Sequence, residues 1–352
     1  MGFQEIGLTP QSEAKIIRLY RALPDDNQTT SFDCSAQERL ESYPSEAMRS
    51  VLTQVRMAAE RQTTILLLGE TGSGKDHLAR FIHKLSRWAS GPYFSLNCAA
   101  VSHELAESEL FGHERGAFTG AYGRKRGLLE LAEDGTLLLN EVGELSLPLQ
   151  AKLLSFLDTR EFTRVGGEKT IRVNSRLITA TNRDLEADVE SGKFRRDLFY
   201  RLNVVSITMP PLRRRREDIP ILAREIIDEL RKDMQLPGMP EIDPAAMNAL
   251  MGYSWPGNVR ELRNVLERAL MSDDKVICAS NLCLKHKPDT WSFTISFPTD
   301  CSLNDTTREL KASLVKEALR RSGGCRDDAA RLLKISRHSL KHYINSLGLK
   351  ED

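Results

Sequence analysis

The sequence predicts an α/β fold, in which helices cover both faces of a parallel sheet, followed by smaller helical parts. Continuous apolar runs alternate with amphipathic segments, as in parallel sheets whose strands are buried on both sides. After Pro210–Pro211 the apolar spacing predicts only helices as far as about Asp274. The apolar runs expected to form strands are Ile65–Leu68, Tyr93–Leu96, Thr136–Leu139 and Arg176–Ala180.

The segments around the sheet divide the chain into five expected parts. Residues 1–35 are polar and hold one short amphipathic pattern, too little for an independent domain. An amphipathic helix is expected from Ser45 towards Arg61, ahead of the first strand. Pro288 and Pro298, with no sustained apolar period around them, indicate a linker. The expected parts are a short N-terminal segment (1–35), the α/β part (36–211), a helical lid (212–274), a linker (275–305) and a helical C-terminal module (306–352).

Composition fits a globular protein of two or three domains, with 352 residues, a formal net charge of +1 and 40% hydrophobic residues. No stretch reaches the length of a membrane span, and the polar N-terminus lacks a signal-peptide pattern. The six cysteines form no CxxC pair and indicate reduced thiols, so a cytoplasmic protein is expected. His338 and His342 are expected at the surface or facing DNA, rather than as metal ligands.

Positive charge is concentrated at the C-terminus. Residues 306–352 contain eleven Lys or Arg and six Asp or Glu, a balance of 11 − 6 = +5. A small basic module on a near-neutral chain indicates an acidic partner such as DNA, although a solvated charged face would have the same composition.

A glycine-rich segment between the first strand and the following helix predicts a phosphate-binding loop. Its glycines allow backbone N–H groups to surround phosphate oxygens, and Lys75 is placed to reach the β and γ phosphates. The general pattern continues with Ser or Thr, whereas this chain has Asp76. A glycine turn without function is the alternative. The loop reads Gly69, Glu70, Thr71, Gly72, Ser73, Gly74 and Lys75.

The strand Thr136–Leu139 leads into Asn140 and Glu141, the place where a Walker B strand carries Asp and Glu. Glu141 is expected to polarise the attacking water. Asn140 has an acceptor oxygen but no charge, so it should hold a Mg²⁺-bound water less strongly than Asp. We expect Mg·ATP to bind with reduced metal affinity and to turn over slowly. The alternative is that hydrolysis is lost.

A second glycine-flanked segment, Gly116-Ala117-Phe118-Thr119-Gly120-Ala121, should present Phe118 and Thr119 at a loop tip. The hexapeptide resembles the GAFTGA loop of sigma-54-dependent transcriptional activators, ring-forming AAA+ ATPases that remodel an RNA polymerase holoenzyme stalled at a promoter. These activators also carry an acidic residue at the position of Asp76. An ordinary surface turn is the alternative reading.

The resemblance assigns further positions. It places a switch residue at Asn97, a sensor I segment at Thr181 and Asn182, and a lid sensor at Arg260. It makes Arg195 and Arg201 donors to the γ-phosphate of a neighbouring subunit, which implies a hexamer-like homo-oligomeric ring. The four arginines at 213–216 are interpreted as the polar start of the lid, not as a nucleic-acid patch. The implied catalytic residues are Glu141, Arg195, Arg201, Asn97 and Asn182, and the implied ATP and Mg²⁺ contacts come from residues 69–76, Asn140 and Arg260.

The C-terminal module is expected to form a helix, a tight turn and a second helix over residues 327–344, capped at Ser336. It resembles the Fis-type helix-turn-helix that ends these activators. Lys334 stands at the usual turn glycine, where a positive φ would cost about 1 kcal/mol. A dimerisation or docking module is the alternative. The apolar seam is expected from Ala329, Ala330, Leu333, Leu340 and Ile344, and DNA contacts from Arg337, His338, Ser339, Lys341 and His342.

Together these features predict an ATP-dependent activator that binds upstream double-stranded DNA and opens promoter complexes of the sigma-54 RNA polymerase holoenzyme. The chain has no room for a receiver domain, so we expect control by a regulatory protein in trans, an unlinked subunit or the expression level. A rival reading, suggested by Asn140, is a nucleotide-responsive DNA-binding regulator without productive hydrolysis. A replication or proteolysis AAA+ machine is disfavoured by the hexapeptide and the C-terminal module.

Overall fold

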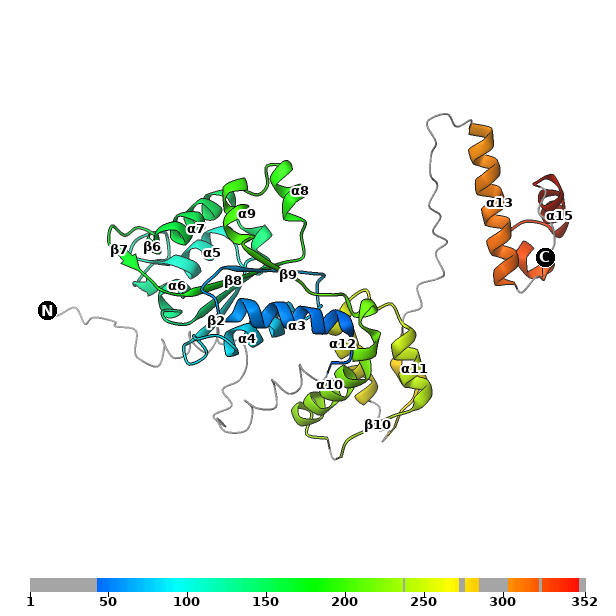
Figure 1. Cartoon of the computed structure of the whole chain (residues 1–352), viewed down its shortest axis with the longest axis horizontal. Coiled ribbons are helices and arrows are strands. Elements are labelled where there is room, and N and C mark those ends of the chain that lie inside the picture. The colour runs from blue at the N-terminus through cyan, green and yellow to red at the C-terminus, as the bar shows by residue number, and fades with distance from the viewer. Residues whose placement is uncertain (1–42, 237, 272–275, 285–302, 323–324, 348–352) are drawn as a thin grey trace. The chain divides into compact units, whose positions relative to one another are not determined.

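The computed structural model describes residues 43–236, 238–271, 276–284, 303–322 and 325–347. The chain divides into two compact units, Met1–Leu284 and Lys285–Asp352, which are described separately here (Figure 1). The expected N-terminal segment 1–35 and the prolines of the expected linker lie outside the described residues.

The first unit is built on a five-stranded parallel sheet in the order β2-β5-β8-β1-β9. Four of its strands are those predicted from the apolar runs, while the fifth, β9, was not identified from the sequence. The carboxyl ends of β1, β5 and β8 lie at one edge of the sheet, where the loops that follow them meet. The strands are β1 (Ile65–Leu68), β2 (Tyr93–Asn97), β5 (Thr136–Asn140), β8 (Arg176–Thr181) and β9 (Val205–Thr208).

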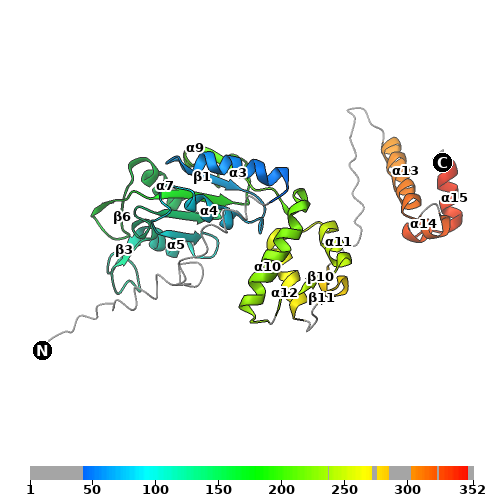
Figure 2. The same cartoon turned by 60° about the horizontal axis from the view of Figure 1, so that its bottom comes forward.

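Helices cover both faces of this sheet (Figure 2). Ile65 and Leu67 of β1 are buried in one core with α3 and α4, whereas Leu66 between them is buried in the opposite core with α5, α7 and α9. This alternation explains why the strand is apolar throughout. The helices are α3 (Glu46–Ala59), α4 (Lys75–Lys84), α5 (His103–Phe111), α6 (Leu128–Leu131), α7 (Leu147–Thr159), α8 (Leu185–Glu190) and α9 (Arg196–Leu202).

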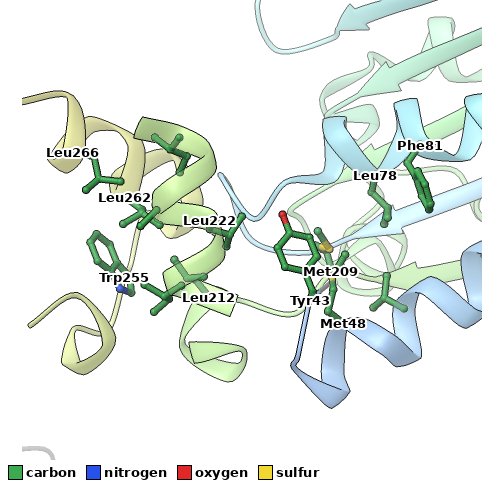
Figure 3. Packing of buried hydrophobic residues seen from close by; sticks show 14 of the residues in the cluster. Tyr43, Met48, Leu78, Phe81, Met209, Leu212, Leu222, Trp255, Leu262 and Leu266 are labelled. Carbon is green, nitrogen blue, oxygen red and sulfur yellow. The ribbon is translucent and has the colours of Figure 1, made fainter. Parts of the chain in front are cut away.

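The lid is mainly helical, as predicted, but it also contains a short parallel pair of strands. That pair corrects the expectation of helix alone. Figure 3 shows Trp255 and Leu262 in the lid core. Ile277 and Leu282, from the stretch expected to be a linker, are buried in the same core, so lid packing extends beyond residue 275. The elements are η2 (Leu212–Arg214), η3 (Arg216–Asp218), α10 (Ile219–Asp233), β10 (Glu241–Ile242), α11 (Pro244–Gly252), α12 (Asn258–Leu270), β11 (Val276–Ile277) and η4 (Ala279–Leu282).

The second unit contains three helices among its described residues, α13 (Leu303–Arg321), α14 (Arg326–Leu332) and α15 (Arg337–Ser346). Ser336 caps α15 by accepting a hydrogen bond from Ser339 N at 3.0 Å. Lys334, in the turn before it, has φ +52°, the left-handed conformation that glycine adopts at lower cost. The small core is formed by Val315, Ala318, Ala329, Ala330, Leu340 and Ile344, with Leu333 partly buried against it.

None of the helices in the described part of the chain combines the length and the apolar character needed to span a bilayer.

His83 of α4 provides a test of the packing at the amino-terminal edge of the sheet. Its ring is buried, its Nδ1 lies 2.8 Å from Thr136 Oγ1, and burial, Arg176 and Lys84 lower its pKa to about 4. The unfolded chain therefore binds more protons between pH 6.5 and pH 4, and acidification across this range should cost about 3 kcal/mol of folding free energy. In the His83→Gln variant, the free energy of unfolding measured with urea should therefore decrease less between pH 7 and pH 4 than it does in the wild type. If the decrease is the same in both proteins, His83 is not its source.

Candidate nucleotide site and exposed loop

The phosphate-loop segment connects β1 to α4, and its glycines are required by close packing as well as by conformation. Gly69, Gly72 and Gly74 have φ values of +149°, +74° and +103°. A Cβ atom on Gly72 would lie 2.5 Å from the carbonyl oxygen of Gly257 in the lid. A side chain at this position would therefore force the lid away from the loop.

Lys75, the first residue of α4, turns its ammonium group back towards this loop. Nζ lies 2.8 Å from Gly69 O, 3.3 Å from Glu70 O and 4.0 Å from Glu141 Oε1. Burial lowers the pKa of Lys75, and the nearby carboxylates of Glu141 and Asp76 oppose that effect. The ammonium group of Lys75 is thus held within the phosphate loop, close to Glu141, which follows β5.

Glu141 follows β5 directly and has φ +53°, which turns its side chain out of the strand. Its Oε2 accepts a hydrogen bond from Asn182 N at 3.1 Å, and Asn182 Nδ2 donates to Thr71 Oγ1 at 2.8 Å. Residues from the ends of β5 and β8 therefore meet the phosphate loop, as expected for the carboxyl edge of a parallel sheet.

Asn140, at the end of β5, is hydrogen-bonded to Asp76, the second residue of α4. Asn140 Nδ2 donates to Asp76 Oδ1 at 2.6 Å, and because a carboxylate only accepts, the amide orientation is fixed. Asn140 Oδ1 is then buried without a hydrogen-bond partner. An orphaned amide oxygen beside a carboxylate is a pair of hard oxygen ligands.

The lid contacts the phosphate loop through residues at the start of α12. Val259 N donates to Gly72 O at 2.9 Å. The next residue, Arg260, is exposed and lies so close to Gly72 that a Cβ atom added to this glycine would be 2.9 Å from the Cβ atom of Arg260. The structure therefore brings Arg260, assigned from the sequence as the lid sensor, next to the loop.

Three further residues at this contact were not identified as site residues from the sequence. Asn258 Nδ2 donates to Glu70 Oε2 at 3.0 Å, Arg213 forms a two-pronged ion pair with Glu70, and Arg215 donates to Ser73 O at 2.5 Å. The sequence indicates this arginine run as the polar start of the lid, without a contact to the loop. Its alternate members Arg213 and Arg215 in fact contact the phosphate loop.

Three predicted residues do not reach the loop within this chain. Asn97 Oδ1 accepts from Ala99 N at 3.0 Å, in its own turn. Arg195 pairs with Asp197 at 2.7 Å, and Arg201 pairs with Asp158 at 3.2 Å and donates to Leu157 O. The side chains of Arg195 and Arg201 are 43% and 47% exposed, and the sequence predicts that these two arginines act on another subunit.

The hexapeptide at residues 116–121 forms the tip of a hairpin between β3 (Gly112–His113) and β4 (Lys125–Arg126). Gly116 N donates to Ala121 O at 2.9 Å and closes the tip. Phe118 is 41% exposed and contacts the ring of His113 edge-on. An aromatic side chain is thus presented on the surface at the position predicted.

The segment that connects β3 and β4 is held by a buried arginine. Arg164 follows β6 (Glu161–Thr163), which pairs with β7 (Thr170–Arg172), and its side chain is 6% exposed. It bonds both oxygens of Glu130 at 2.8 and 2.6 Å and reaches Glu114, just before the tip, at 2.7 Å. Charge-assisted hydrogen bonds therefore join the turn of the β6–β7 hairpin to Glu114, in the segment between β3 and β4, and to Glu130 of α6.

In the second unit, the residues predicted to contact DNA lie at the start and along the face of α15. Arg337 pairs with Asp327 of α14 at 3.3 Å. Arg337, His338, Lys341 and His342 are exposed, and Ser339 is half-buried.

Comparison with family models identifies both parts of the first unit. Residues 42–208 match the sigma-54 interaction domain, and residues 213–291 match the AAA+ ATPase lid domain.

The chain is also similar to individual proteins over most of its length. It is 44% identical to regulatory protein AtoC of Escherichia coli K12 over 309 residues, covering 87% of this chain and 67% of AtoC. It is 47% identical to a Nif-specific regulatory protein of Herbaspirillum seropedicae over 291 residues, covering 77% and 54%. The chain thus spans about half to two thirds of the length of these relatives.

Crystal structures of NtrX from Brucella abortus, in complex with ADP and with ATP, have a similar fold. Their TM-scores are 0.63 and 0.62 at 30% identity, covering 96% of this chain and 74% and 73% of theirs.

Proposed function

Because this chain belongs to the family of sigma-54-dependent transcriptional activators, we propose that it hydrolyses ATP to remodel the sigma-54 RNA polymerase closed complex at promoters. Members of the family are ATPases of the AAA+ class. The observation that carries the proposal is the meeting of Lys75, Glu141 and Asn182 at the glycine loop, with Phe118 presented on a separate hairpin of the same domain.

Nucleotide binding follows from the loop and its surroundings. The backbone N–H groups of residues 69–74 and the start of α4 favour phosphate, and Lys75 supplies positive charge next to it. The NtrX structures with ATP and ADP support the same ligand here. Glu141 would orient and deprotonate the attacking water, held in place by the Asn182 N–H.

Asn140 and Asp76 have side chains that fit a Mg²⁺ ion. The buried, unpartnered Asn140 Oδ1 and the carboxylate of Asp76 are the oxygen donors this ion prefers, with waters completing its shell. When bound with ATP, the ion would neutralise phosphate charge. Asp76 and Asn140 would hold it, directly or through water.

Hydrolysis would require a second subunit. Arg195 and Arg201 are exposed and lie outside this chain's own loop, so we propose that each reaches the γ-phosphate bound by a neighbour in a homo-oligomeric, hexamer-like ring. Asn97, on the strand beside Asn140, would exchange its turn contact for one that relays nucleotide state to the exposed hairpin.

The remaining contacts are assigned to two partners. Residues 116–121, with Phe118 and Thr119 at the tip, would engage the sigma-54 subunit. Residues 337–342 of α15 would bind upstream double-stranded DNA, their basic and hydroxyl side chains reaching phosphates and base edges as in a Fis-type helix-turn-helix.

Thr119→Ala tests this function. Open-complex formation at a sigma-54 promoter should require hydrolysable ATP and should fall at least tenfold in the variant, because the tip loses its contact while the nucleotide site is untouched. The variant's ATPase rate should stay near the wild-type value. Promoter opening by Thr119→Ala at the wild-type rate, or opening with a non-hydrolysable analogue, would overturn the proposal.

A second candidate function follows from Asn140, which lacks the charge expected at its position. In this alternative the protein binds ATP and DNA without productive hydrolysis. ATP and DNA binding in the absence of open-complex formation would support it over the first proposal.

The variant Asn140→Asp distinguishes the ATP-hydrolysing activator from the regulator that binds ATP without hydrolysis. The added charge should lower the Mg²⁺ concentration for half-maximal hydrolysis several-fold and raise turnover, although without Mg²⁺ the new carboxylate would repel Asp76 across 2.6 Å. The measurement is an ATPase rate across a Mg²⁺ titration, with Asp76→Asn as the opposite change. Superimposable titrations of wild type and Asn140→Asp would show that the missing charge does not limit the enzyme.

A further inference from the structure

The outward carbonyl groups of the phosphate loop are bound by the lid. A loop that binds an anion through successive N–H groups must turn its carbonyl groups to the opposite side. Here the oxygens of Thr71, Gly72 and Ser73 accept hydrogen bonds from Asn258 Nδ2 at 3.1 Å, Val259 N at 2.9 Å and Arg215 Nη2 at 2.5 Å. Three consecutive carbonyls are thus held by residues of the lid.

Asn258 is the centre of this contact. Its side chain is fully buried, and its Oδ1 accepts from Leu212 N at 2.8 Å while its Nδ2 donates to Glu70 Oε2 and Thr71 O. Its φ of +54° is a conformation that Asn tolerates better than most residues. One amide therefore joins the phosphate loop, the segment leaving the sheet and the first turn of α12.

The neighbouring ion pair is the weaker part of the contact. Arg213 and Glu70 are 42% and 43% exposed, and pairs at that exposure contribute little to stability. The hydrogen bonds from Arg213 and Asn258 lower the pKa of Glu70 to about 2, so its carboxylate stays an acceptor in moderately acidic solution as well as at neutral pH. A buried donor such as the Asn258 amide loses more when its acceptors are removed.

We propose that Asn258 is a positioning residue for nucleotide binding. Through it the docked lid holds the phosphate loop in its anion-binding shape, and nucleotide affinity and lid docking are thereby linked. By reciprocity, a bound nucleotide should stabilise the docked lid. This inference deepens the proposed function and depends on it for the ligand, a nucleoside di- or triphosphate.

The test measures dissociation constants of ADP and ATP for the full chain at a temperature well below unfolding. Asn258→Ala should weaken both nucleotides about tenfold or more and leave their ratio unchanged, because the loop binds the phosphates common to both. Asn264→Ala, an exposed asparagine on the same helix, should stay within twofold of wild type. Hydrogen exchange should show that nucleotide protects the start of α12 in wild type and not in Asn258→Ala.

A second variant keeps the test decisive where the cavity left by alanine prevents folding. Asn258→Asp preserves volume and the acceptor for Leu212 N, but it removes the donor and places a carboxylate beside Glu70. Its affinity should fall at least as far, and adding Glu70→Gln, which supplies an amide donor, should restore part of it. A folded Asn258 variant that binds both nucleotides within twofold of wild type overturns the inference, as does a double variant with no recovery.

Different results would contradict the proposed function and the role of Asn258. If wild-type protein binds neither nucleotide, the proposed function fails. If wild type binds and the Asn258 variants bind equally well, only the role of Asn258 fails.

Discussion

Glu141→Gln should lower ATP hydrolysis about a hundredfold or more while the protein still binds ATP. The amide preserves the shape of the side chain and can still accept from Asn182 N, but it cannot take a proton from water. Nucleotide should therefore accumulate unhydrolysed in the site. The measurement pairs a steady-state phosphate-release assay with a direct ATP-binding titration.

Glu144→Gln is the matched control. Glu144 lies three residues further along, is 44% exposed and pairs with Arg183 at 3.2 Å. This variant should hydrolyse ATP at close to the wild-type rate. A Glu141→Gln protein with wild-type turnover would remove Glu141 from the role of general base.

Arg195→Ala should reduce hydrolysis about a thousandfold, because a guanidinium supplied by a neighbour stabilises charge on the γ-phosphate. Among the described residues Arg195 forms its ion pair with Asp197, two residues away, and its loss should not disturb the fold. ATP binding to isolated subunits should stay unchanged. Arg196→Ala, the adjacent exposed arginine, is the control and should retain activity.

Mixing the inactive variants distinguishes action between subunits from action within one. An Arg195→Ala subunit keeps its own Glu141, and a Glu141→Gln subunit can supply Arg195 to that site. Mixed rings should therefore recover part of the lost hydrolysis. If mixtures stay as inactive as either variant alone, Arg195 does not act across a subunit boundary.

The features predicted correctly from the sequence depend on local patterns. Four strands follow from apolar runs, because strands buried on both faces carry apolar side chains throughout. The exposure of Phe118 follows from the flanking Gly116 and Gly120, with φ values of +83° and +108°, and the cap at Ser336 from the residue type alone.

The features that were missed depend on contacts between distant residues. Glu70 and Asn258 lie 188 residues apart, and nothing near either residue indicates that they meet. The arginines at 213–216 appeared as one polar run, yet Arg213 is exposed while Arg215 is 2% exposed. The short strands β10 and β11, only two residues each, are set by lid packing rather than by propensity.

The buried Arg164 has a mechanical consequence for the exposed hairpin. Ion pairs at the surface break at little cost in free energy. The side chains of Arg164 and Glu130 are only 6% and 8% exposed, so breaking this pair would leave a charge buried without a partner, and the two residues resist separation. Gly166, beside them, is in such close contact with Ala117 that an added Cβ would lie 2.8 Å from the alanine's own. The segment that carries Phe118 is thus held tightly against Arg164 and Gly166. We expect it to move together with the β6–β7 hairpin rather than to bend on its own.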